Sequence, residues 1–143
     1  MRRAVCAVFV LAGCAGLEPG AEPLPAGPSL AVFAVEAAPL LERRCVDAGC
    51  HGDAARPFAL YAPGRRRANP SDTFLNVPLT NAEFSANRDA TLGFLDAEPL
   101  RDSTLLRKSL GELGHGGGVV FVHPSDPEFR ALVRGLMAPG DAQ

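Results

Sequence analysis

Two cysteines and a histidine lie close together at Cys45, Cys50 and His51, in the run Cys-Val-Asp-Ala-Gly-Cys-His. A pair of thiols followed directly by an imidazole is typical of c-type haem attachment, where the usual spacing is C-x-x-C-H. Each thiol adds to a vinyl group, and the adjoining imidazole can bind the iron. Here the spacer has four residues, and Gly49 offers backbone freedom for the extra two. The run predicts one covalent haem c, attached at Cys45 and Cys50, with His51 as the proximal iron ligand.

Two other uses of these thiols stay open at the level of sequence. Cys45 and Cys50 could form a small disulfide loop, which is normal in an exported chain. A zinc site would need a fourth ligand, and the adjacent Cys50 and His51 fit a tetrahedron poorly. A disulfide gives no reason for His51 to follow Cys50, so haem is the preferred interpretation.

A second axial ligand has three candidate donors, His115, His123 and Met137. His115 stands in Leu-Gly-His-Gly-Gly-Gly, where glycines let the backbone approach a flat ring without Cβ clashes. His123 precedes Pro124 at an expected surface turn, and Met137 belongs to an apolar helix face, where Met is commonly core filler. We expect His115 as the distal ligand, with Met137 as the alternative. A flexible loop that leaves the sixth position open is the third possibility.

The first residues have the pattern of an export signal. Arg2 and Arg3 precede the apolar run Ala4–Ala12, which is shorter than the about 20 residues that span a bilayer. The run closes on Leu11-Ala12-Gly13-Cys14, which resembles the lipobox of bacterial lipoproteins. That resemblance implies removal of residues 1–13 and lipidation of Cys14, and Ala15 after it implies the outer membrane of the cell envelope. An ordinary signal peptide cut nearby is the alternative.

A linker and one domain follow. Residues 14–29 are rich in Pro and Gly and form a tether, residues 30–139 form the folded domain, and residues 140–143 form a tail. The apolar pattern predicts a helix over Leu30–Arg44, either kinked at Pro39 or beginning near Glu36.

Further elements are expected toward the C-terminus. A short helix is predicted over Asp102–Leu110, and Val119–Val122 is β-prone. Ser125 and Glu128 have the spacing of a capping box, with Pro127 at the start of a last helix. The apolar face of that helix is Phe129, Leu132, Val133, Leu136 and Met137. Pro57–Ala90 is expected to be rich in turns.

The segment from Phe33 through Pro39-Leu40-Leu41 to Cys45, Cys50, His51 and Gly52 resembles cytochrome c-like domains of exported bacterial proteins. The resemblance continues at Ser103–Lys108, His115–Gly118 and Asp126–Phe129. It implies a mainly α, cytochrome c-like fold, with terminal helices packed around a covalently attached haem and a loop-rich middle. Apolar side chains would pack on that haem, from Phe33, Leu40, Phe58, Phe121, Phe129 and Val133, and Arg65–Arg67 are candidates for binding its carboxylates.

The composition limits the function classes. With 143 residues, 47% apolar and 21% charged, the chain has room for one compact domain, and a net charge of −2 gives no footprint for nucleic acid. It contains no G-x-S-x-G, P-loop, H-E-x-x-H or G-x-G-x-x-G motif. We expect a lipid-anchored monohaem electron carrier in the periplasm, whose redox partners the sequence does not name. A haem enzyme or sensor with an open sixth site, and a haem-free structural lipoprotein with a Cys45–Cys50 disulfide, are the alternatives.

Overall fold

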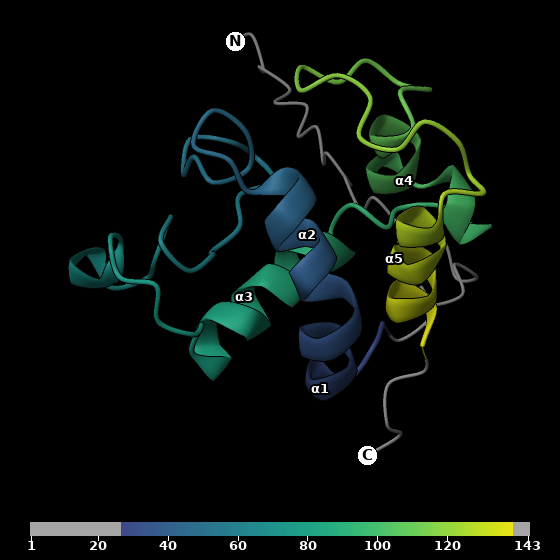
Figure 1. Ribbon diagram of the computed structural model, residues 1–143. Helices are drawn as coiled ribbons and strands as arrows, with labels where there is room; N and C mark the ends of the chain where they lie inside the picture. The colour runs from purple at the N-terminus through teal and green to yellow at the C-terminus, as the bar shows by residue number, and fades with distance from the viewer. Residues whose placement is uncertain (1–26, 139–143) are drawn as a thin grey trace, which may run out of the picture.

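The computed structural model describes residues 27–138, which fold mainly into helices (Figure 1). Cys14 and the export signal lie outside these described residues. No strand occurs in the described part of the chain, and the elements follow in the order α1 (Leu30–Val32), η1 (Phe33–Ala37), α2 (Ala38–Cys45), η2 (Pro70–Asp72), α3 (Asn81–Leu92), η3 (Leu100–Asp102), α4 (Thr104–Ser109) and α5 (Pro127–Met137). A mainly helical fold with helices near both ends of the domain is therefore confirmed.

The first helical stretch runs unbroken through α1, η1 and α2, and it agrees with the predicted Leu30–Arg44. Ser29 caps its start, since the Ser29 hydroxyl accepts from the Val32 N–H. The η1 segment is a π-helical turn, in which the Ala38 N–H donates to the carbonyl of Phe33, five residues earlier. This turn stands directly before Pro39, whose ring nitrogen has no hydrogen to donate. The wider turn lets the helix continue past the proline.

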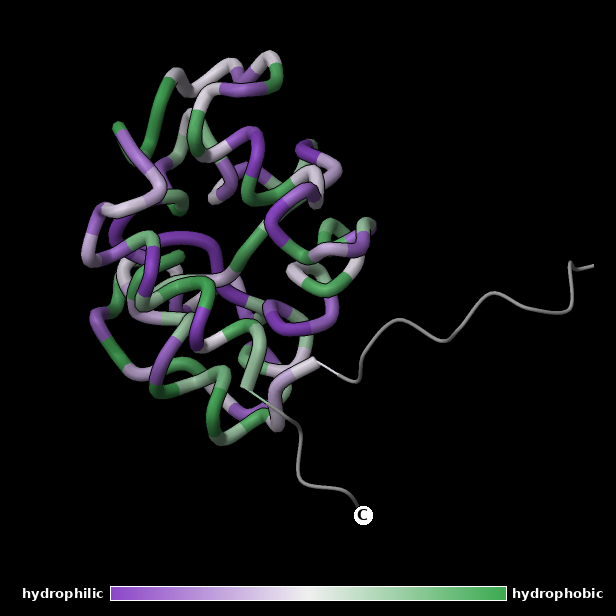
Figure 2. Tube along the Cα trace, turned by 90° about the vertical axis from the view of Figure 1, so that its right-hand side faces the viewer, coloured by the Kyte–Doolittle hydropathy of each residue, from purple (hydrophilic) through white to green (hydrophobic). Residues whose placement is uncertain are grey.

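The C-terminal helix α5 packs against η1, so the two terminal helical stretches form one side of the core. Gly135 makes this approach possible, because a Cβ there would lie 2.8 Å from the Glu36 Cβ and 3.2 Å from the Ala37 nitrogen. The Phe121 and Phe129 rings meet nearly edge to face, with centroids 5.5 Å apart. Figure 2 shows apolar and polar residues alternating in short runs along the trace, as expected of elements that bury one side.

Two details of the last helix differ from the sequence prediction. The capping residue is Asp126, whose carboxylate accepts from the Glu128 and Phe129 N–H groups, and Ser125 instead contacts His123. A carboxylate is a favourable cap because the helix N-terminus carries partial positive charge. Met137 lies outside the core, with 62% of its surface exposed.

Helix α3 was missed by the sequence prediction, which placed only turns in this region. Its fully buried residues are Glu83, Asn87 and Thr91, at helical spacing but polar. The apolar Phe84, Ala90 and Leu92 pack against the core only in part and form no continuous apolar stripe. The start of α3 does carry a readable signal, a capping box between Thr80 and Glu83. The predicted β-prone run Val119–Val122, in contrast, forms no strand.

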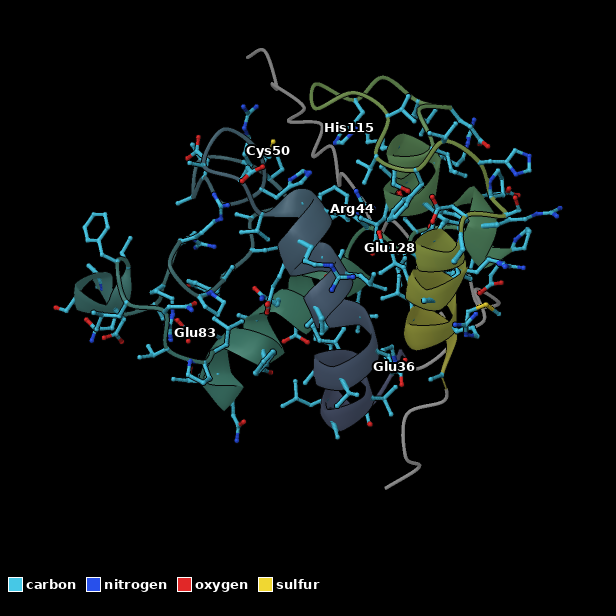
Figure 3. All side chains as sticks on the ribbon, in the orientation of Figure 1. Glu36, Arg44, Cys50, Glu83, His115 and Glu128 are labelled. Carbon is cyan, nitrogen blue, oxygen red and sulfur yellow. The ribbon has the colours of Figure 1, made fainter. Side chains whose placement is uncertain are left out.

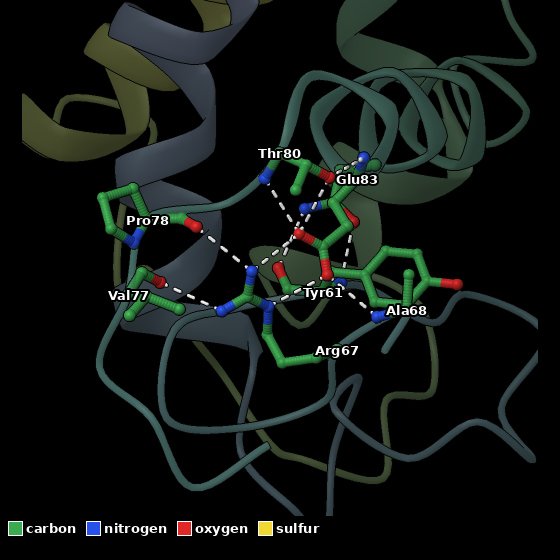
Figure 4. A network of polar contacts seen from close by, with 8 residues as sticks. Tyr61, Arg67, Ala68, Val77, Pro78, Thr80 and Glu83 are labelled. Atoms are coloured by element: carbon green, nitrogen blue, oxygen red, sulfur yellow. Dashed lines mark hydrogen bonds and ion pairs between the residues drawn. The ribbon is translucent and has the colours of Figure 1, made fainter. Parts of the chain in front are cut away.

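Figure 4 shows the polar network that attaches α3 to the segment before it, residues 67–80, which we call the arm. The guanidinium of Arg67 donates twice to the Glu83 carboxylate, at 2.9 Å each, and also to the carbonyls of Val77 and Pro78 at 3.0 and 3.1 Å. Both charged side chains are almost fully buried, at 1% and 2% exposure. The Ala68 N–H and the Thr80 N–H and hydroxyl complete the shell around Glu83. The two buried charges of this network are thus paired with each other and with polar groups around them.

The folded part begins slightly before the predicted boundary. Pro28 is fully buried, and its carbonyl accepts from Arg88 Nε at 2.6 Å. Gly27 lies against Leu92, where a side chain would have no room. The last residues of the predicted tether therefore belong to the domain. None of the described helices is long and apolar enough to cross a membrane.

We expect Glu83→Gln to lower the free energy of unfolding by about 3 kcal/mol at pH 7, because it leaves the buried Arg67 charge without its partner. The hydrogen bonds from Arg67 lower the pKa of Glu83 from 4.5 to about 2. The folded-state pKa is depressed, so the stabilisation is complete above pH 4.5 and is lost as the pH falls through 2. Urea unfolding of both proteins between pH 7 and pH 2 measures the difference.

Asp89→Asn is the matched control, since Asp89 is an exposed acid on the same helix. A Glu83→Gln chain as stable as the Asp89→Asn chain at pH 7 would contradict the role of the network.

Candidate functional site

The cysteine and histidine run lies in a tight turn directly after α2. The His51 N–H donates to the Cys45 carbonyl at 3.1 Å, and the Cys50 N–H donates to the Asp47 backbone carbonyl at 2.9 Å. The glycine that this turn needs is Gly52, because a Cβ there would lie 2.9 Å from the Asp47 carbonyl oxygen. Gly49, expected to absorb the longer spacer, has no positive φ and no close neighbour. The four-residue spacer is therefore accommodated by ordinary turns.

Both thiols of this turn are free and line the same cleft. Burial, with the nearby Cys50 thiol adding, raises the pKa of the Cys45 thiol to about 12. Cys45 is thus a neutral thiol in the folded chain, packed at the edge of the core. The predicted alternative of a Cys45–Cys50 disulfide is not formed in this structure.

The imidazole of His51 is held by the backbone in one orientation. Its Nδ1 lies 2.7 Å from the Phe58 carbonyl, and its own carbonyl accepts from the Leu60 N–H at 2.7 Å. A carbonyl can only accept, so Nδ1 carries the hydrogen and the lone pair of neutral His51 is on Nε2. Burial lowers the pKa of His51 and outweighs the hydrogen bond to the Phe58 carbonyl, which raises it, while His115, Arg56 and Lys108 act in the same direction as burial. These effects favour a neutral ring with one free nitrogen.

His115 faces His51 and has the same tautomer. Its Nδ1 lies 2.7 Å from the Gly118 carbonyl, so its free lone pair is also on Nε2. The two imidazole rings are nearly parallel, 10° apart, with centroids separated by 5.8 Å. Gly118 has a φ of +76°, a conformation that L side chains rarely adopt, which places its carbonyl within reach of His115. The structure thus brings together two residues that are 64 positions apart in the chain.

A cleft of about 340 Å³ surrounds these two histidines. It lies between the end of α2 with its following turn and α4 with the glycine loop that holds His115. Figure 3 labels Cys50 on one side and His115 on the other, with Arg44 below them. The lining residues are Arg44, Cys45, Gly49, Cys50, His51, Arg56, Pro57, Phe58, Phe94, Thr104, Leu105, Lys108, Ser109, His115, Gly116, Gly117 and Val120.

The cleft wall is cationic. Arg44, Arg56 and Lys108 line it, and no Asp or Glu is among the described lining residues. Arg44 is held by an ion pair with Glu128 of α5, and Arg56 donates to the Gly49 carbonyl at 3.1 Å. Thr104 and Ser109 of α4 line the same cleft as Lys108, and their hydroxyls donate to Asp96 and to the Leu106 carbonyl. A cleft lined by Phe58, Phe94 and Leu105 together with these cations suits a largely apolar ligand that carries acidic groups.

The other predicted ligands lie elsewhere. Met137 is exposed at the end of α5 and does not line the cleft. His123 is also outside it, and its Nδ1 accepts from the Ser125 N–H at 3.1 Å, which places the hydrogen of the neutral ring on Nε2. His123 therefore has the opposite tautomer from His51 and His115.

The predicted carboxylate-binding run Arg65–Arg67 has partners outside the cleft. Arg65 pairs with Asp47 at 2.8 Å, Arg66 stacks over Tyr61, and Arg67 is buried with Glu83. Of the apolar side chains expected around a haem, Phe58 lines the cleft, whereas Phe33, Leu40, Phe121, Phe129 and Val133 pack in or against the core behind it.

Several lining residues could not be found from the sequence. Arg56, Phe94 and Lys108 belong to no motif, and only the folding of separate segments brings them to one cleft. Lys108 alone had a signal, since it lies within the predicted short helix Asp102–Leu110 and ends the Ser103–Lys108 part of the resemblance. Within residues 27–138 no group of three or more His, Cys, Asp or Glu side chains is placed to hold a bare metal ion.

Comparison of the chain with models of known families, with curated proteins and with solved structures gave no match.

We expect the Cys45 thiol of the haem-free folded chain to react with iodoacetamide at least about tenfold more slowly at pH 8 than a free cysteine. Burial and the raised pKa both keep it a neutral thiol, while the thiolate is the nucleophile. Mass spectrometry of peptides after timed labelling measures this rate for each cysteine separately. In 8 M urea the rate at Cys45 is expected to rise to that of a free cysteine. Fast labelling of Cys45 before unfolding would show that the turn is not packed as described.

Proposed function

We propose that the protein is a lipid-anchored monohaem c-type cytochrome that transfers single electrons at a membrane surface. The observation that carries the proposal is the pair of nearly parallel imidazoles, His51 and His115, 5.8 Å apart in one cleft, each with Nδ1 at a carbonyl and no hydrogen bond at Nε2 among the described residues. Histidines that bind a metal almost always donate their other ring N–H to a carbonyl or carboxylate. Both rings already have that arrangement.

The thiols support covalent attachment in the same cleft. Cys45 and Cys50 line it beside His51 and form no disulfide. Together with His51 they supply what c-type attachment requires, two thiols and an adjacent imidazole. Within residues 27–138 the cysteine and histidine side chains are not grouped to hold a bare ion, which favours a ligand that brings its own four nitrogens over zinc.

The cationic side chains that line the cleft support the binding of a haem, because haem carries carboxylates. Arg56 and Lys108 are the residues that we assign to the haem carboxylates, in place of the Arg65–Arg67 run, because they line the cleft and have no carboxylate partner among the ion pairs of the described residues. Phe58, Phe94 and Leu105 provide the apolar surface for the flat ring. The cytochrome c-like fold indicated by the sequence resemblance is part of this proposal.

The chemistry that haem supplies is the one-electron couple of ferric and ferrous iron. If His51 and His115 both held the haem iron, no position would be left for a substrate, and outer-sphere electron transfer would be the remaining activity. Two imidazole ligands also favour a lower potential than a His and Met pair, since a Met ligand raises it. We therefore favour a carrier over an enzyme.

Covalent haem is tested on protein produced with a cytochrome c maturation system. We expect a pyridine haemochrome spectrum from the purified chain. From a Cys45→Ala, Cys50→Ala double variant, we expect acid extraction to remove any bound haem, so that none stays on the protein. Each single variant keeps one thioether, so its spectrum is expected to shift toward that of a vinyl haem. A colourless wild-type chain with Cys45 and Cys50 joined to each other would favour the structural lipoprotein.

The distal ligand is tested with carbon monoxide. We expect the ferrous wild-type protein to bind it poorly, and His115→Ala to bind it readily because the sixth position is then open. Met137→Ala is the matched control and is expected to leave the spectrum and the potential unchanged, since Met137 lies outside the cleft. Ready binding to wild type would indicate an open site, and a sulfur-to-iron charge-transfer band that Met137→Ala removes would make Met137 the ligand.

A further inference from the structure

A run of exposed apolar side chains lies on the part of the arm between η2 and α3. Phe74 is 93% exposed, Leu75 49% and Val77 41%. The surrounding residues Thr73–Thr80 include no charged side chain. In Figure 1 this arm extends away from the helices on the left, far from the segment that joins α4 and α5. Large apolar side chains that project together from an arm mark an interaction surface.

The backbone of this arm is ordered by specific bonds behind the exposed side chains. The Leu75 carbonyl accepts from the Gly64 N–H at 3.1 Å, and the Leu75 N–H donates to the Asp72 backbone carbonyl at 2.9 Å. The carbonyls of Val77 and Pro78 are held by the buried guanidinium of Arg67. These bonds fix the backbone while Phe74, Leu75 and Val77 point outward, so their exposure is built into the fold.

The chain before the domain is long enough to bring this arm to a membrane. Gly27 lies against Leu92, the last residue of α3, and the arm precedes the first residue of that helix. The helix has 12 residues and is about 18 Å long. The 13 steps from Cys14 to Gly27 can extend to about 45 Å at roughly 3.5 Å per residue. A lipid at Cys14 would therefore keep the arm within reach of the bilayer.

We propose that Phe74, Leu75 and Val77 are a membrane-docking loop, which inserts into the boundary between headgroups and acyl chains of the bilayer that holds the Cys14 lipid. The inference rests on the lipid anchor of the proposed function. Near the loop Arg65 is paired to Asp47, and Asp72 adds one negative charge, so no excess of positive charge there favours anionic lipid over neutral lipid. Three apolar side chains bind a bilayer weakly alone, but an anchored chain meets it at high effective concentration. Docking then fixes how the domain faces the membrane.

The test uses the mature lipidated chain in phosphatidylcholine vesicles. The sequence contains no Trp, so Phe74→Trp introduces a single indole at the tip of the loop. Val122→Trp is the matched control, since Val122 is 90% exposed on the segment between α4 and α5. For each variant, emission is compared between ordinary lipid and lipid with brominated acyl chains, so that quenching by haem cancels.

We expect the Phe74→Trp emission to lie at shorter wavelength and to fall at least twofold in brominated lipid, with Val122→Trp unchanged. Equal, unquenched emission from both variants would overturn the proposal. A short-wavelength emission at Phe74→Trp without bromine quenching would also overturn it and indicate contact with a second copy. Intact mass of the same sample reports haem and lipid separately. Loss of haem alone would refute the electron carrier and leave the docking result standing, whereas absence of lipid would refute the anchor and the docking together.

Discussion

The turn that follows α2 is the constraint on which the rest of the site depends. Within it the His51 N–H donates to the Cys45 carbonyl, and the Phe58 carbonyl accepts from Nδ1 of the imidazole. The two thiols and the free Nε2 of His51 are thereby placed on one wall of the cleft, next to the core. The facing wall comes from α4 and the glycine loop, where the Gly118 carbonyl fixes His115 in the same tautomer. Each ring is oriented by the backbone, so the geometry does not depend on a bound ligand.

The arm and α3 stabilise this arrangement from the other side by polar pairing. Glu83, Asn87 and Thr91 face inward, and the first two bind Arg67 and the Tyr61 backbone respectively. A buried ion pair contributes little net stability over an apolar pair, but breaking it costs several kcal/mol. The same Arg67 holds the carbonyls beneath the exposed apolar loop. One buried guanidinium therefore connects the interior of the domain with the surface that we assign to the membrane.

Patterns that depend on neighbouring residues could be predicted from the sequence, and those that depend on distant residues could not. The helices around Leu30–Arg44 and Pro127–Met137 followed from apolar spacing, and the Cys45, Cys50 and His51 run from its residue types. Helix α3 was missed because its fully buried residues are polar, although its capping box was readable. Asp126 was missed as a cap because Ser125 matched the pattern one residue earlier. The opposition of His51 and His115, and the places of Arg56 and Lys108, arise from segments that only the fold brings together.

The proposed electron carrier requires one haem, bound through thioethers at Cys45 and Cys50 of a lipid-bearing chain. The intact mass of the protein isolated from the cell envelope tests it most directly, because lipid and haem each add a known mass to the chain that begins at Cys14. We expect both additions on one polypeptide, with the haem retained after treatment with acid and organic solvent. A mass equal to the bare polypeptide less two hydrogens, the value for a single disulfide, would contradict it.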